Sequence, residues 1–76
     1  MLYNELKDFL YLNYCFGLTA AIRKKTIIYT HKRYMPSKGF LILKVKVDKK
    51  TKEVISVFNK DTEYTDFDEL KKIILS

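Results

Sequence analysis

The sequence predicts a single small α+β domain over residues 1–76, built as a three-stranded antiparallel sheet with an N-terminal and a C-terminal helix packed on one face (α-β-β-β-α). Three observations support this class. A chain of 76 residues suffices for one domain only. Its central segment alternates apolar and polar residues with the two-residue period of a strand, whereas both ends show the spacing of amphipathic helices.

The first helix is expected over residues 2–16. Its apolar residues fall within one arc of a helical wheel: Leu2, Leu6, Phe9 and Phe16. Gly17 follows where a helix commonly ends in a left-handed residue. Residues 18–25 fit either the start of a strand or a further helical turn, and the sequence leaves both open.

The strongest strand signal covers residues 40–47, after a β-like segment that begins at Thr26. Four apolar residues occupy one face in strict alternation and are expected to meet the helices: Leu41, Leu43, Val45 and Val47. Residues 48–52 predict a hairpin turn, with Lys52 at the left-handed position, and residues 53–58 predict the returning strand.

The last segment predicts a polar connection over residues 59–64 and a second helix over residues 67–75. Thr65 or Asp66 would cap this helix, because each is followed three residues later by an acidic side chain. Acids in the first turn and lysines near the end match the helix dipole.

Composition excludes several functional classes. One Cys allows no internal disulfide, which favours a reducing, cytoplasmic location. One His and one Cys cannot supply a transition-metal site, so no metal or other cofactor is expected. The uncharged stretch over residues 9–22 is too short to span a bilayer and lacks the basic start of a signal peptide, so no membrane partner is expected.

Charge is the most informative quantity. The net charge is +6, yet residues 22–52 hold eleven Lys or Arg against a single acid, and both ends of the chain are net acidic. Such polarity attracts anions to one region of the molecule. Basic side chains neutralise phosphates, and the interleaved aromatic rings can stack on bases.

The sequence therefore predicts a non-enzymatic binder of a phosphate-bearing ligand, either nucleic acid or a nucleotide. The candidate contacts are Arg23, Lys24, Lys25, His31, Arg33, Lys44 and Lys46. The same lysines would also be present if they served only to keep the protein soluble and to protect strand edges from pairing. No catalytic residue is assigned.

A protein-interaction module is the alternative. Tyrosines are expected on the outer face of the first helix, and apolar residues on the outer face of the sheet, where they would form a partner or dimer interface: Tyr3, Tyr11, Tyr14, Phe40 and Ile42. The size of the chain would suit a small inhibitor from a phage or mobile element. Such an inhibitor would bind an acidic host protein that acts in defence or handles nucleic acid. A homodimer fits the same residues.

A metal-free ribonuclease is the third hypothesis. Tyr29, His31 and Arg33 alternate along one expected strand and so share a face, which would have to be the face of Lys44 and Lys46 for catalysis. The element order resembles that of double-stranded-RNA-binding domains. Their last helix starts with basic residues, however, and the acidic start at residues 66–69 speaks against that family.

Overall fold

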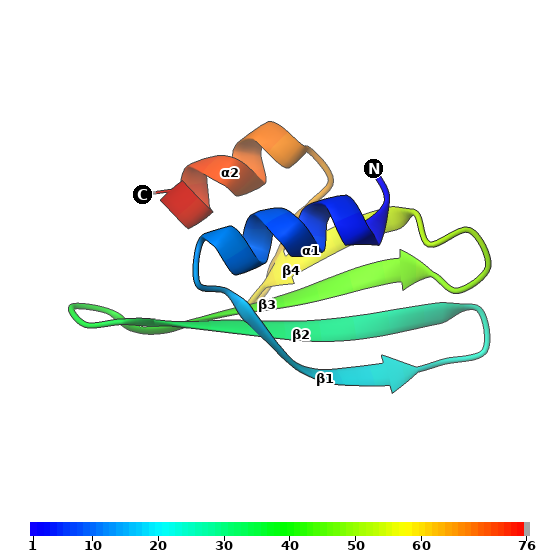
Figure 1. Ribbon diagram of the computed structural model, residues 1–76, viewed down its shortest axis with the longest axis horizontal. Coiled ribbons are helices and arrows are strands. Elements are labelled where there is room, and N and C mark those ends of the chain that lie inside the picture. The colour runs from blue at the N-terminus through cyan, green and yellow to red at the C-terminus, as the bar shows by residue number, and fades with distance from the viewer. Residues whose placement is uncertain (76) are drawn as a thin grey trace.

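The computed structural model of the protein describes residues 1–75 and shows two helices on one face of a five-stranded antiparallel sheet (Figure 1). The elements are α1 (Tyr3–Leu12), β1 (Phe16–Ile22), β2 (Thr26–Met35), β3 (Gly39–Asp48), β4 (Val54–Asn59), β5 (Thr62–Tyr64) and α2 (Phe67–Leu75). The spatial order of the strands follows the chain, β1-β2-β3-β4-β5, so each neighbouring pair is a hairpin.

The α+β class is confirmed, but the three-stranded sheet is wrong, because the order is α-β-β-β-β-β-α. One missed strand is β1, whose seven residues are all exposed, so that no alternation of apolar and polar residues marks it. The other is β5, three residues long, which lies in the expected polar connection. Lys60, at a φ of 56°, makes the tight turn that lets β5 pair with β4.

The first helix is shorter than expected, and it ends at Leu12 because Tyr14 takes the left-handed conformation, at a φ of 63°. The amide of Cys15 donates to the carbonyl of Leu10 at 2.8 Å, which closes the helix end. Gly17 is part of β1 instead. A Cβ at that position would lie 3.2 Å from the hydroxyl of Tyr11, so the close approach of α1 favours glycine there.

The core lies between the helices and the sheet. The predicted inward face of β3 is confirmed, since Leu41, Leu43, Val45 and Val47 are all buried. These residues cluster with apolar side chains of both helices: Leu6, Leu10, Leu70 and Ile74. None of the helices in residues 1–75 has the length and apolar character needed to cross a membrane.

The starts of both helices are held by hydrogen bonds. The amide of Tyr3 donates to the carbonyl of Lys52 at 2.9 Å, which ties the start of α1 to the β3–β4 hairpin. Lys52 has the expected positive φ, at 66°. The predicted second helix is confirmed at Phe67–Leu75, and the Asp66 carboxylate accepts from the amide of Asp68 at 3.0 Å as its cap.

Candidate functional site

The pairing of β2 with β3 sorts the central side chains onto two faces of the sheet. Ten consecutive residue pairs join these strands, and His31 lies opposite Leu43 while Arg33 lies opposite Leu41. Because residues paired across a sheet share a face, His31 and Arg33 point to the helix side. The alternate residues point away from the helices, among them Lys44, paired with Thr30, and Lys46.

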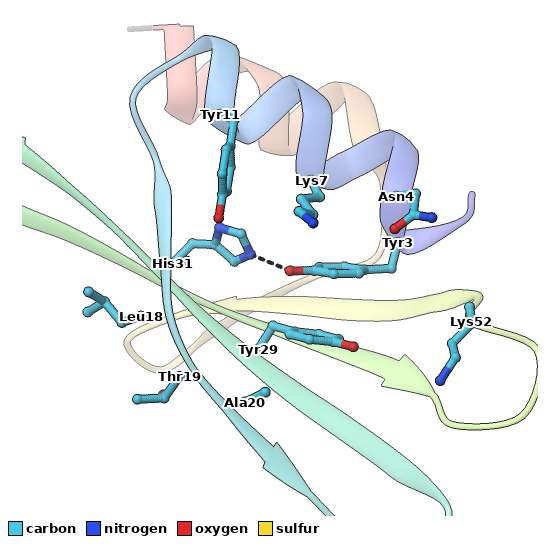
Figure 2. Close-up of a pocket in the computed structure, with 11 residues that line it drawn as sticks. Tyr3, Asn4, Lys7, Tyr11, Leu18, Thr19, Ala20, Tyr29, His31 and Lys52 are labelled. Atoms are coloured by element: carbon cyan, nitrogen blue, oxygen red, sulfur yellow. Dashed lines mark hydrogen bonds between the residues drawn. The ribbon is translucent and has the colours of Figure 1, made fainter.

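His31 is therefore not part of a surface with Lys44 and Lys46. Its side chain is fully buried beneath α1, next to Tyr3 (Figure 2), and both ring nitrogens have partners inside the protein. Nδ1 lies 3.1 Å from the carbonyl oxygen of Cys15, which can only accept, so Nδ1 carries the proton. Nε2 then accepts from the Tyr3 hydroxyl at 2.8 Å. Burial lowers the pKa of His31 and keeps the ring neutral.

Tyr3 is a core residue instead of an outer tyrosine of α1. Its ring stacks on Tyr29 with the ring centroids 3.9 Å apart, and burial raises the pKa of its phenol (Figure 2). The reason is helical spacing, because Tyr3 shares its arc with Leu6 and Leu10. Tyr11 and Tyr14 are exposed, but Tyr11 points toward the sheet, with its ring centroid 6.0 Å from that of His31 (Figure 2), and Tyr14 follows the end of α1.

Arg33 binds the ends of the two helices. One guanidinium nitrogen, Nη1, donates to the carbonyl of Ile74 in α2 at 2.6 Å and to that of Asn13, just after α1, at 3.4 Å. The last carbonyls of a helix lack partners within it and carry the negative end of its dipole. Arg33 therefore connects both helix ends to the sheet and is not free for a phosphate.

The side of the sheet away from the helices, called the open face below, carries lysines among aromatic and aliphatic side chains. Its residues on β2 and β3 are Ile28, Thr30, Lys32, Tyr34, Phe40, Ile42, Lys44 and Lys46. The ammonium of Lys32 lies 3.8 Å from the centroid of the Phe40 ring, and the rings of Tyr34 and Phe40 meet at 5.3 Å.

A hollow of about 290 Å³ lies on the open face. It is lined by Phe40, Ile42, Lys44, Phe58, Asn59 and Lys60. Phe40 is 53% and Ile42 43% exposed, as expected for the outer side of the sheet. Lys32, Phe58 and Lys60 were missed as contacts in the sequence. The alternation of β2 could have revealed Lys32 once its pairing with β3 was known, whereas nothing in the sequence fixes the position of Phe58 opposite Lys44.

The basic run Arg23-Lys24-Lys25 lies at one end of the same sheet, in the β1–β2 turn. The amide of Lys49 donates to the carbonyl of Lys25 at 3.0 Å, so this turn lies beside the β3–β4 turn. Lys24, Lys25, Lys49 and Lys50 line a hollow there with Asp48. The predicted contacts thus separate into an end cluster, the open-face pair Lys44 and Lys46, and the two helix-side residues His31 and Arg33.

By register, two acidic residues share the open face: Asp48 at the end of β3, paired with Thr26, and Glu63 of β5, opposite Phe58. The carboxylates of the last helix belong to the layer on the other side of the sheet (Figure 1). Within residues 1–75, the one ion pair joins the N-terminal amine to Glu53. Lys44 and Lys46 are therefore left without a carboxylate partner in the part of the chain that the structure describes, and their charge is directed to solvent.

A second hollow, of about 470 Å³, lies between α1 and β1, and Lys7 and Lys52 are among its lining residues (Figure 2). The His31 imidazole and the Tyr3 phenol also line this hollow, but they are hydrogen-bonded to each other, so neither presents a free atom for proton transfer. Cys15 is buried, and burial raises the pKa of its thiol, which disfavours the reactive thiolate. The ribonuclease hypothesis loses His31 as its acid or base.

Metal ligands do not gather anywhere in residues 1–75, since no group of three or more His, Cys, Asp or Glu lies close enough to hold an ion. Comparison with known proteins gives no further guide to the site. No protein-family model, no curated protein and no solved structure matches the chain. The function is therefore argued from the geometry of the two sheet faces.

The buried histidine predicts a loss of stability in mild acid. Its pKa is lowered in the folded state, so the unfolded chain binds more protons and the free energy of unfolding falls as the pH drops below about 6.5. His31→Gln should be less stable at neutral pH by about 1–3 kcal/mol, because Tyr3 and the Cys15 carbonyl lose their partner. The variant should also lack the wild-type decrease in stability between about pH 7 and pH 5. Urea unfolding at several pH values measures both effects, and an equal decrease in the two proteins would contradict this role.

Arg33 and Lys32 are adjacent cations on opposite faces and offer a matched comparison. Arg33→Met should lower the free energy of unfolding by about 1–3 kcal/mol, because partly buried helix-end carbonyls lose a charged donor. Lys32→Met should change it by no more than about 0.5 kcal/mol, since its ammonium lies on the open face. Thermal and urea unfolding of both variants measure the difference, and equal losses would refute the assignment of Arg33 to the helix ends.

Proposed function

We propose that the protein is a non-enzymatic binder of nucleic acid and that the open face is its contact surface. The supporting observation is the composition of that face, where Lys32, Lys44 and Lys46 lie on the same two strands as exposed Tyr34, Phe40 and Ile42. Lysines would neutralise phosphates while aromatic rings stack on bases, the combination used for single strands.

The shape of the surface supports single strands over duplex. A sheet face offers a broad platform, and the hollow beside Phe40 adds aromatic lining from Phe58. Bases can stack on such rings only when they are unpaired, because in a duplex their faces are already covered by neighbouring bases. The end cluster around Lys24 and Lys49 would extend the path of the phosphates along the sheet.

Binding should be salt-dependent and largely independent of base sequence. For a single strand, the slope of log K against log salt is about −0.7 for each phosphate contact, so three lysines give roughly −2. Fluorescence anisotropy with a labelled homopolymeric oligonucleotide at several salt concentrations measures the slope. A mononucleotide and a duplex of equal length serve as comparison ligands.

Paired charge reversals locate the surface. Lys44→Glu with Lys46→Glu should reduce affinity by at least tenfold, and Phe40→Ala should reduce it through lost stacking, worth about 1–3 kcal/mol per base. Lys71→Glu with Lys72→Glu makes the same change of net charge on α2, on the other side of the sheet, and should have a much smaller effect. No binding at low salt, or equal loss in both double variants, would refute the proposal.

A protein-interaction role is the second candidate, favoured by an exposed aromatic patch at the end of α1. Leu12 is 79% and Tyr14 70% exposed, and Phe16 packs edge-on against both Tyr11 and Tyr14. Inhibition of a host nucleic-acid-handling or defence protein by a phage or mobile-element chain would be one use of such a patch. The cytoplasmic location stays a prediction.

The two candidates separate in a co-purification experiment. A tagged chain is recovered from cells with and without nuclease, and a stoichiometric protein that survives nuclease and is lost in Tyr14→Ala would favour the second candidate. Tyr34→Ala is the matched control, because it removes an exposed tyrosine from the open face instead. Loss of all partners on nuclease treatment would leave nucleic-acid binding as the better account.

A further inference from the structure

The strand β1 is an unusual sheet edge. It ends the order of the five strands, so its outer side pairs with no other strand in residues 1–75. All seven of its residues are exposed, and none is charged or a proline. Alternate backbone N–H and C=O groups of such an edge point outward and can accept another strand.

The opposite edge strand, β5, has two features that discourage the addition of another strand and that β1 lacks. β5 has only three residues, and Glu63 places a charge within it. Short length and inserted charge both discourage strand addition. On β1, by contrast, Phe16 is 49%, Leu18 59% and Ile22 69% exposed, so apolar side chains accompany the unpaired backbone. Adding a strand would bury both.

We propose that β1 pairs in antiparallel fashion with β1 of a second copy of this chain, giving a continuous sheet of ten strands. A two-fold axis close to Ala20 would place Leu18 opposite Ile22 of the second copy, so that apolar side chains meet. The bulge between Gly17 and Thr19 leaves Thr19–Ile22 in regular pairing with β2, so the regular part of the strand lies beside this axis.

The distribution of charge favours a second copy in this orientation. Arg23-Lys24-Lys25 directly follow β1, and in an antiparallel pair the two basic runs lie at opposite ends of the strands. With Ala20 at the axis, Arg23 lies opposite Gly17 of the second copy, so six residue steps of about 3.3 Å separate the nearest members of the two runs by roughly 20 Å. The Debye length at physiological salt is about 8 Å, so their repulsion is screened. Lys24 would instead lie beside the exposed Phe16 ring of the second copy.

The pairing itself does not depend on the proposed function, but it has a consequence for it. The two-fold axis of such a pair is perpendicular to the sheet, so the open faces of both copies lie on the same side. A nucleic acid would then meet two sets of Lys32, Lys44 and Lys46 on one surface. Because a single edge strand buries little area, we expect a reversible dimer whose population rises with protein concentration.

Sedimentation velocity without nucleic acid tests the pairing separately from the proposed function. The wild-type chain should pass from monomer to dimer as its concentration rises to about 200 µM, as expected of a small interface. Ala20→Lys places two like charges at the axis and should remain monomeric. Ile55→Lys makes the same change at an exposed isoleucine of β4 and should dimerise like the wild type.

Crosslinking gives a second measurement that does not require loss of binding. Ala20→Cys should form a disulfide-linked dimer on mild oxidation, because Cα atoms paired across an antiparallel sheet lie about 4.5–5.5 Å apart. Ile55→Cys should crosslink far less, and the buried Cys15 should not compete. A wild-type chain that stays monomeric at the highest concentration, or equal behaviour of the position 20 and position 55 variants, would overturn the proposal.

Discussion

The register between β2 and β3 decides which side chains of this molecule can reach a ligand. Ten consecutive pairs hold the two strands, and a slip of one residue would exchange the two faces. The register is fixed because Leu41, Leu43, Val45 and Val47 must all be buried together. Once those residues face the helices, Lys44 and Lys46 must face solvent, while His31 and Arg33 must enter the helix layer.

The polar residues on the helix side act as structural connections in a domain with a small core. The hydrogen bond from Tyr3 to His31 and the stacking of Tyr3 on Tyr29 hold the start of α1 to β2. Two residues after His31 on the same strand, Arg33 holds the last turn of α2. A chain of this size buries a modest fraction of its surface, so satisfied buried polar contacts help to specify a single arrangement. His31 and Arg33, which the sequence suggested as ligand contacts, therefore stabilise the fold instead.

The elements with a strong local signal were predicted well. The alternation of β3 correctly indicated its buried face, and the capped second helix was predicted with its observed bounds. β1 could not be recognised, because a strand exposed on all its residues has no hydrophobic periodicity. The face of α1 on which Tyr3 lies was predicted wrongly, because only packing against β2 decides that Tyr3 is buried while the adjacent Leu2 is exposed.

Part of the candidate site was predictable, because alternation along one strand shows which of its residues share a face. Lys44, Lys46, Phe40 and Ile42 follow from the alternation of a single strand. Assigning His31 to the same surface required the pairing of two strands, which depends on the length of the turn at residues 36–38 and on the core. Lys32 joins the open face through that pairing, and Phe58 joins it through the pairing of β4 with β3.

The claim that the open face is the binding surface is tested most directly by a nuclear magnetic resonance titration with a short single-stranded oligonucleotide at low salt. Backbone amide signals should shift along β2 and β3, most strongly near Lys32, Phe40 and Lys44, with α1 and α2 almost unchanged. Shifts concentrated in the helices or in the hollow beside Lys7, or no shifts at all, would contradict the account.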